Sequence, residues 1–186
     1  MDRPVNERLR SILGKLIWFH QKDRYYLLQI LIHWLVVLLV IEQYWSSRAI
    51  LRMNASGPFL GPAQPFDMVL HEAHIFVGLG IFVLIAIRVF LRIQLGAPAW
   101  NPPLPIWRQW LSLGVQFGLY GVLLAQSMSG AITSYLWWRM SIVHKALFYL
   151  MLLLIAMHIA GALWSLTGHA RETILRITGW RLAKRA

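Results

Sequence analysis

Cysteine is absent from the 186-residue chain, which excludes disulfides, iron–sulfur clusters, thiolate metal sites and covalent attachment of a c-type haem. Charge is also scarce, since only 13% of the residues are charged and 58% are hydrophobic. Acidic residues are the rarer of the charged ones, with seven Asp and Glu against eighteen Lys and Arg. A water-soluble domain of this composition would be unusual, so we expect one integral membrane domain with no separate soluble module.

The net charge of +11 would suggest a nucleic-acid partner in a soluble protein, but here the positive residues lie at the ends of apolar stretches. Six Lys and Arg lie in residues 1–24 and five lie from Arg171 onward. The connection between the second and third apolar stretches adds Arg88, Arg92 and Arg108. The first and third connections together hold four Lys and Arg. By the positive-inside rule, both termini and the middle connection are cytoplasmic. We therefore expect lipid, and no nucleic acid, around the chain.

Four apolar stretches are long enough to cross a hydrocarbon core of about 30 Å. They cover approximately residues 25–45, 69–93, 111–131 and 142–166. A proline- and tryptophan-rich loop at 96–110 should lie along the cytoplasmic interface. Short links between four spans predict an all-α membrane protein, an antiparallel bundle of four transmembrane helices, an architecture that often houses cofactors in its core.

The chain divides into three parts on this pattern. Residues 1–24 form a basic, partly amphipathic cytoplasmic segment, which we expect to lie on the anionic inner leaflet. Residues 25–168 form the four-helix transmembrane domain, and residues 169–186 form a basic cytoplasmic tail.

Four histidines lie inside or at the edge of the spans, where imidazole is costly and therefore indicates a functional site. His33 lies about 12 Å into the first span, and His158, in the inward-running fourth span, falls at a similar depth. His74 and His144 open the second and fourth spans on the outer side. His144 and His158 are fourteen residues apart, nearly four helical turns, so one helix face carries both at a separation of about 21 Å. The four rings sort into two layers, each with one histidine from each of two helices.

Each layer offers two imidazoles without a carboxylate or thiolate, whereas zinc and copper sites usually need three or four protein ligands. Two imidazoles suit a flat iron porphyrin with both axial positions filled, which favours electron transfer over oxygen activation. Arg88 lies fourteen residues after His74, so it should point inward near the cytoplasmic layer, where a haem propionate needs a cation. The alternative for Arg88 is a snorkelling residue that marks the end of the span. His71 competes with His74 but is expected at the outer interface.

Glycines recur in the third span at Gly114, Gly118 and Gly121, spaced by four and three. Small residues at this spacing let a neighbouring backbone approach closely. Ordinary helix packing explains the stripe, and a flat cofactor between helices would use the same stripe, so both interpretations stay open.

With these residues assembled, the chain resembles the bacterial cytochrome b561 family of small diheme membrane proteins. The matching segments cover roughly residues 25–179: LQILIHWLVVLLV around His33, HIFVGLGIFVLIAIRVFLRI from His74 through Arg88, HKALFYLMLLLIAMHIAGAL from His144 through His158, and TILRITG. The resemblance implies two non-covalent b-type haems. It pairs His33 with His158 on the cytoplasmic-side haem iron and His74 with His144 on the outer-side haem iron. It also implies a multi-pass protein of the bacterial inner membrane.

Members of that family exchange electrons between quinone and a periplasmic partner, or oxidise superoxide at the outer face. The resemblance thus implies transmembrane electron transfer between the quinone pool and a periplasmic or membrane redox protein, rather than a stand-alone oxidoreductase. This chain departs from the family pattern at Gln116 and Ser165, where histidines are common, and in its short third connection at 134–141. These departures put superoxide oxidation in doubt, together with any quinone site that needs the extra histidines.

Two other functions stay open. A haem-free metal or proton transporter would carry an acidic residue near midspan beside the histidines, and the sequence offers none. A cytochrome subunit that anchors a larger membrane dehydrogenase would use the loop with Trp137, Trp138 and Arg139 as a docking patch. A stable co-purifying subunit would distinguish this anchor from a free-standing relay.

Overall fold

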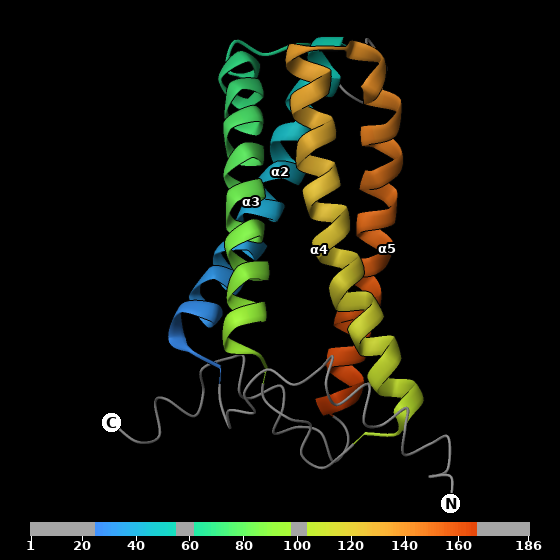
Figure 1. Cartoon of the computed structure of the whole chain (residues 1–186). Coiled ribbons are helices and arrows are strands. Elements are labelled where there is room, and N and C mark those ends of the chain that lie inside the picture. Colours follow the sequence, from blue (N-terminus) through green and yellow to red (C-terminus); the bar gives the residue numbers. More distant parts are fainter. Residues whose placement is uncertain (1–24, 55–61, 98–103, 167–186) are drawn as a thin grey trace, which may run out of the picture.

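A computed structural model describes residues 25–54, 62–97 and 104–166 of the chain, and these residues form a bundle of long helices (Figure 1). The four long helices are each long and apolar enough to cross a membrane. They are α2 (Leu27–Asn54), α3 (Asp67–Leu95), α4 (Ile106–Tyr135) and α5 (Ser141–Leu166), and a short 3-10 helix, η1 (Trp138–Met140), precedes α5. The predicted all-α, four-helix membrane bundle is therefore confirmed, and the protein is a multi-pass membrane protein. The predicted N-terminal segment and C-terminal tail lie outside the described residues.

The two largest differences from the predicted spans lie at the end of α2 and at the start of α4. Helix α2 continues to Asn54, past the apolar stretch, because its polar last third still packs inward: Ser46 and Ala49 are buried. Helix α4 begins at Ile106, so the prediction of an interfacial loop up to Trp110 is wrong at its last five residues. Pro105 precedes this helix with a φ of −52°, and a proline at that point starts a helix readily because it has no N–H to leave unpaired.

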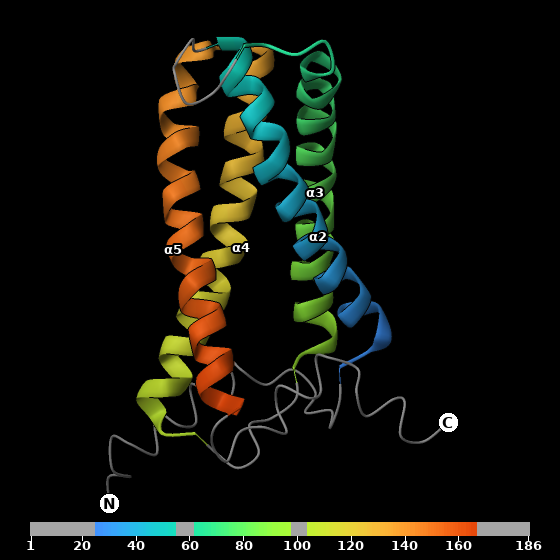
Figure 2. The same ribbon diagram turned by 180° about the vertical axis from the view of Figure 1, so that it is seen from behind.

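The helices alternate in direction, and close packing joins consecutive ones: α2 with α3, α3 with α4, and α4 with α5. Figure 2, the view from behind, shows α2 crossing α3 at an angle. The ends of α2 and α4 and the starts of α3 and α5 lie together at the top of Figures 1 and 2, hereafter the upper end. The opposite end is the lower end.

The buried core is small and the outer surface is apolar. Seven hydrophobic side chains make the core, and most other large apolar side chains are exposed, as expected where lipid replaces water. Helix α5 contributes a single buried residue, Met151, to this core. The core residues are Ile32, Val36, Ile81, Ile85, Val122, Leu123 and Met151.

An ion pair fixes α2 against the start of α3 at the upper end. Both guanidinium nitrogens Nε and Nη2 of Arg52 donate to the carboxylate of Asp67, which is only 1% exposed. The same carboxylate accepts the backbone N–H of Gln64 at 2.8 Å. This two-pronged contact sets the register of α2 on α3 and thereby the position of the side chains one to two turns below it.

Candidate functional site

The structure brings the four histidines of the sequence analysis together in two pairs. In the lower pair, His33 of α2 faces His158 of α5, with ring centroids 6.4 Å apart. In the upper pair, His74 of α3 faces His144 of α5, and the centroids are again 6.4 Å apart. All four residues are half-buried. His71, the competitor of His74, is not part of either pair.

The spacing of the rings fits a metal ion held between them. A metal–imidazole bond is about 2 Å long, so two rings on opposite sides of one ion have centroids about 6 Å apart. Within the described residues, no group of three or more His, Cys, Asp or Glu could hold a metal ion. Each pair could therefore supply two ligands, which is the number that a porphyrin iron needs.

The helices that carry the facing histidines are not the ones that pack closely. Close backbone packing in the described part of the chain runs between consecutive helices, whereas the histidine pairs join α2 to α5 and α3 to α5. A group held by both rings of a pair would therefore bridge helices whose backbones do not pack closely. The residues present thus fit a porphyrin at each of two levels.

The ring of His74 is held by Ser46 in a defined tautomer. The hydroxyl of Ser46 donates to the Glu42 carbonyl at 3.1 Å, so its oxygen is left to accept a hydrogen bond. Nδ1 of His74 lies 2.9 Å from that oxygen, so while the hydroxyl donates to the carbonyl, Nδ1 is the donor of this contact and carries the proton. The other ring nitrogen, Nε2, then has a free lone pair, as a metal ligand requires. Gln43 Nε2 donates to the backbone carbonyl of His74 at 2.9 Å and holds the same turn of α3.

The ring of His144 is held in the same tautomer by α4. Its Nδ1 lies 3.0 Å from the carbonyl of Gln126, which can only accept, and 3.1 Å from the hydroxyl of Ser129. Nδ1 therefore carries the proton, and Nε2 has the lone pair, which now accepts from the Gln126 side-chain amide at 3.2 Å. Among the described residues the carbonyl oxygen of that amide is buried without a hydrogen-bond partner, so the amide is held through its NH2 group alone.

Gly130 of α4 makes room for the ring of His144, although its position in the sequence gave no sign of this role. A Cβ added at Gly130 would lie 3.1 Å from Cε1 of His144, closer than ordinary contact, so only glycine leaves the ring its present place. In the stripe that the sequence suggested, a Cβ added at Gly118 would lie 3.4 Å from Leu154 Cδ1, which supports the helix-packing interpretation at this position. Cβ atoms at Gly114 and Gly121 would meet no atom within 4 Å.

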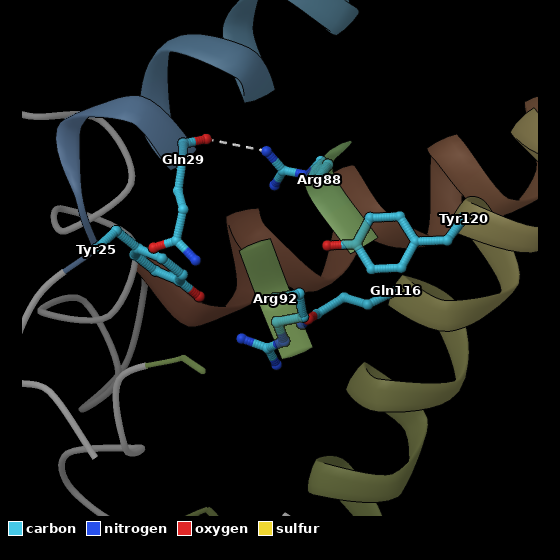
Figure 3. A pocket seen from close by; sticks show the side chains of 6 residues that line it. All are labelled: Tyr25, Gln29, Arg88, Arg92, Gln116 and Tyr120. Atoms are coloured by element: carbon cyan, nitrogen blue, oxygen red, sulfur yellow. Dashed lines mark hydrogen bonds between the residues drawn. The ribbon is translucent and has the colours of Figure 1, made fainter. Parts of the chain in front are cut away.

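Arg88 points into the bundle near the lower pair. Its Nη1 donates to the carbonyl of Gln29 at 3.0 Å, and the guanidinium lies 6.0 Å from the ring centroid of Tyr120 (Figure 3). The arginine is close enough to interact electrostatically with both His33 and His158.

A pocket opens beside Arg88 at the lower end of the bundle. Figure 3 shows its lining, which comes from the start of α2 and from facing turns of α3 and α4. Arg92, expected only to mark topology, lines this pocket, and so does Gln116, which the sequence analysis noted for replacing a histidine. The lining residues are Tyr25, Gln29, Arg88, Arg92, Gln116 and Tyr120.

The chain was then compared with known proteins. The family model for prokaryotic cytochrome b561 matches residues 24–180, which is most of the chain. The chain belongs to the prokaryotic cytochrome b561 family. No curated protein and no solved structure gives a significant match. The resemblance seen in the sequence is thereby confirmed, and this cytochrome b561 is a membrane electron-transfer protein that uses b-type haem.

The polar residues that hold the histidines of this cytochrome b561 were missed by sequence reasoning. Ser46, Gln126, Ser129 and Gly130 all contact or make room for a histidine of another segment. The available signal was small polar residues in otherwise apolar helices, at the depth of the outer histidines. That signal does not say which helix a hydroxyl faces, so it could not have named the partners.

Proposed function

We propose that this cytochrome b561 passes electrons across the membrane through two b-type haems, each held by two histidines. His33 and His158 would hold one haem, and His74 and His144 would hold the other. One observation carries the proposal: two histidine pairs with 6.4 Å between centroids bridge helices that do not pack closely, and both pairs share α5. The fourteen residues from His144 to His158 correspond to about 21 Å along the helix, which suits two stacked cofactors.

When bound, each haem supplies an iron that cycles between the ferric and ferrous states. The two histidines of each pair would hold the haem between them, and both being used would leave no ligand position for oxygen. Arg88 would neutralise a propionate of the haem at the lower pair, because its guanidinium is close enough to interact electrostatically with both His33 and His158. Apolar helices around the pairs exclude water from the path of the electron.

We further propose quinone as the redox partner at the lower end. Two guanidinium groups, two amides and two phenols line the pocket of Figure 3 and can donate hydrogen bonds to the carbonyl oxygens of a quinone. By the distribution of positive charge, this end faces the cytoplasm of a bacterium, and both termini lie on that side of the inner membrane. A periplasmic or membrane redox protein would meet the upper end.

A partner subunit at the upper end is the second candidate, in which the chain anchors a larger dehydrogenase. Trp137 and Trp138 are exposed there, and the Arg139 guanidinium lies 5.7 Å from the ring centroid of Trp138. Exposed tryptophans equally suit an anchor in the lipid headgroups. We therefore keep the free-standing relay as the proposed function.

Single histidine substitutions test the ligand assignment. In purified, haem-replete protein, His33→Ala and His158→Ala should each remove the same one of two haems, and His74→Ala and His144→Ala should each remove the other. The haem content and the reduced-minus-oxidised spectrum measure this loss.

His71→Ala is the matched control, since it lies three residues from His74 and should keep both haems. The ligand assignment would be overturned if His71→Ala lost a haem while His74→Ala kept both. Protein without any b-type spectrum after expression with excess haem would contradict the proposed function itself.

A further inference from the structure

Hydrogen bonds orient the upper pair of histidines through both rings. Ser46 is 1% exposed and Ser129 is 4% exposed, so neither hydroxyl competes with bulk water for its contact. Oγ of Ser46 lies 2.9 Å from Nδ1 of His74, whose ring also contacts the backbone of Gln43. Nδ1 of His144 donates to the Gln126 carbonyl and lies 3.1 Å from Oγ of Ser129. An acceptor at Nδ1–H makes the opposite nitrogen a stronger donor to a metal.

The lower pair has a different environment. Among the described residues, no hydrogen bond reaches a ring nitrogen of His33 or His158, and the group that acts on both rings is the cation of Arg88. A fixed positive charge favours the ferrous over the ferric state, because ferrous iron carries one positive charge fewer. A stronger nitrogen donor favours the ferric state. The two environments therefore act in opposite directions on the two irons.

We propose that Ser46 is a positioning residue which, with the Gln126 carbonyl at His144, sets the haem of the upper pair at a lower reduction potential than the haem of the lower pair. The inference rests on the proposed function, because it assumes a haem at each pair. With a haem at each pair, one electron would pass spontaneously from the upper to the lower haem, which would oxidise the upper iron to ferric and reduce the lower iron to ferrous. No bond is formed or broken, and no proton is transferred between the two sites.

Potentiometric titration of the purified protein with both haems bound tests this asymmetry. The wild type should show two midpoint potentials. The more negative of them should belong to the haem of the upper pair, which His74→Ala removes. Ser46→Ala should shift this lower midpoint upward and leave the other unchanged. Ser46→Thr, which keeps the hydroxyl, should restore the wild-type value.

Ser47→Ala is the matched control, because the hydroxyl of Ser47 donates to the Tyr44 carbonyl at 2.8 Å on another face of the same helix turn. It should move neither midpoint. Arg88→Gln should shift the higher midpoint potential, that of the haem at the lower pair His33 and His158, downward. If the Ser46→Ala protein loses the haem of the upper pair, Ser129→Ala is used as the test variant instead. The same upward shift of the more negative midpoint potential is expected.

Two results would overturn the inference. One is a Ser46→Ala or Ser129→Ala protein with two haems and unchanged midpoints. The other is assignment of the lower midpoint to the haem that His33→Ala removes. Both results leave the proposed function standing, whereas a wild type that binds fewer than two haems would remove the proposed function and not address the role of Ser46.

Discussion

Small hydroxyl side chains serve two needs at once in the apolar helices. In lipid an unsatisfied polar group is costly, and Ser46 and Ser129 each satisfy their own hydroxyl by donating to a carbonyl one turn earlier, at 3.1 and 2.9 Å. The oxygen that remains faces a histidine of a neighbouring helix in both cases. The ring orientation thus follows from helix packing and does not require a charged residue near midspan.

Gly130→Ala should disturb the upper pair selectively. The new Cβ would lie 3.1 Å from Cε1 and 3.4 Å from Nδ1 of His144, so the ring must move, at an overpacking cost of about 1–3 kcal/mol. We expect weaker binding or loss of the haem of the upper pair, with the other haem retained. Haem content and visible spectra measure this difference.

Gly121→Ala is the control for this substitution, because a Cβ at Gly121 of the same helix meets no atom within 4 Å. Equal haem loss in both variants, or full retention of both haems in Gly130→Ala, would show that the close approach at Gly130 does not hold His144 in place.

The histidines could be selected from the sequence, whereas their supports could not. Imidazole is rare enough in an apolar span that His33, His74, His144 and His158 stood out, and a fixed rise per residue gave their depth. The contact of Ser46 with His74 joins residues 28 positions apart on different helices. Its geometry depends on how α2 lies on α3, which periodicity within one helix does not specify.

At the scale of helices, α5 combines weak packing with two candidate ligands. Met151, its one buried residue, lies seven positions from both His144 and His158, so all three share one face of the helix. Hydropathy located this helix to within one residue, since its whole length is apolar. Hydropathy failed at the end of α2, where Ser46 to Asn54 are helical because they pack on α3 and not because they are apolar.

The ion pair between α2 and α3 yields an element-scale prediction. Asp67→Asn removes the carboxylate charge that Arg52 faces and should lower the thermal midpoint of the haem-loaded protein. The haem of the upper pair should be lost before the other on heating, because the register of α2 on α3 places Ser46 against His74. Thermal melts followed at the haem absorption band check both effects.

Glu72→Gln provides the control, since Glu72 is an exposed carboxylate on the same helix. Its melt should match that of the wild type. An Asp67→Asn protein that melts like the wild type would contradict a stabilising role for the ion pair.

At the scale of the whole molecule, charge and cofactor geometry agree. Fourteen of eighteen Lys and Arg flank the predicted cytoplasmic side, and the pocket with Arg88 and Arg92 lies at that same end of the bundle. The two histidine pairs divide the interior into two levels joined by α5, and with a haem at each level an electron would have a path between the membrane faces. Composition and hydropathy were sufficient for this outline, whereas the lower pocket required the three-dimensional arrangement of three helices.

The haem-to-protein ratio of the purified wild type tests the central claim most directly. Haem b is extracted and quantified against protein determined by amino-acid analysis, after expression with excess haem. Two histidine pairs predict two haems b per chain, both low-spin in the ferric state. A ratio of one or less in folded protein, or a high-spin iron with an open axial position, would contradict the account.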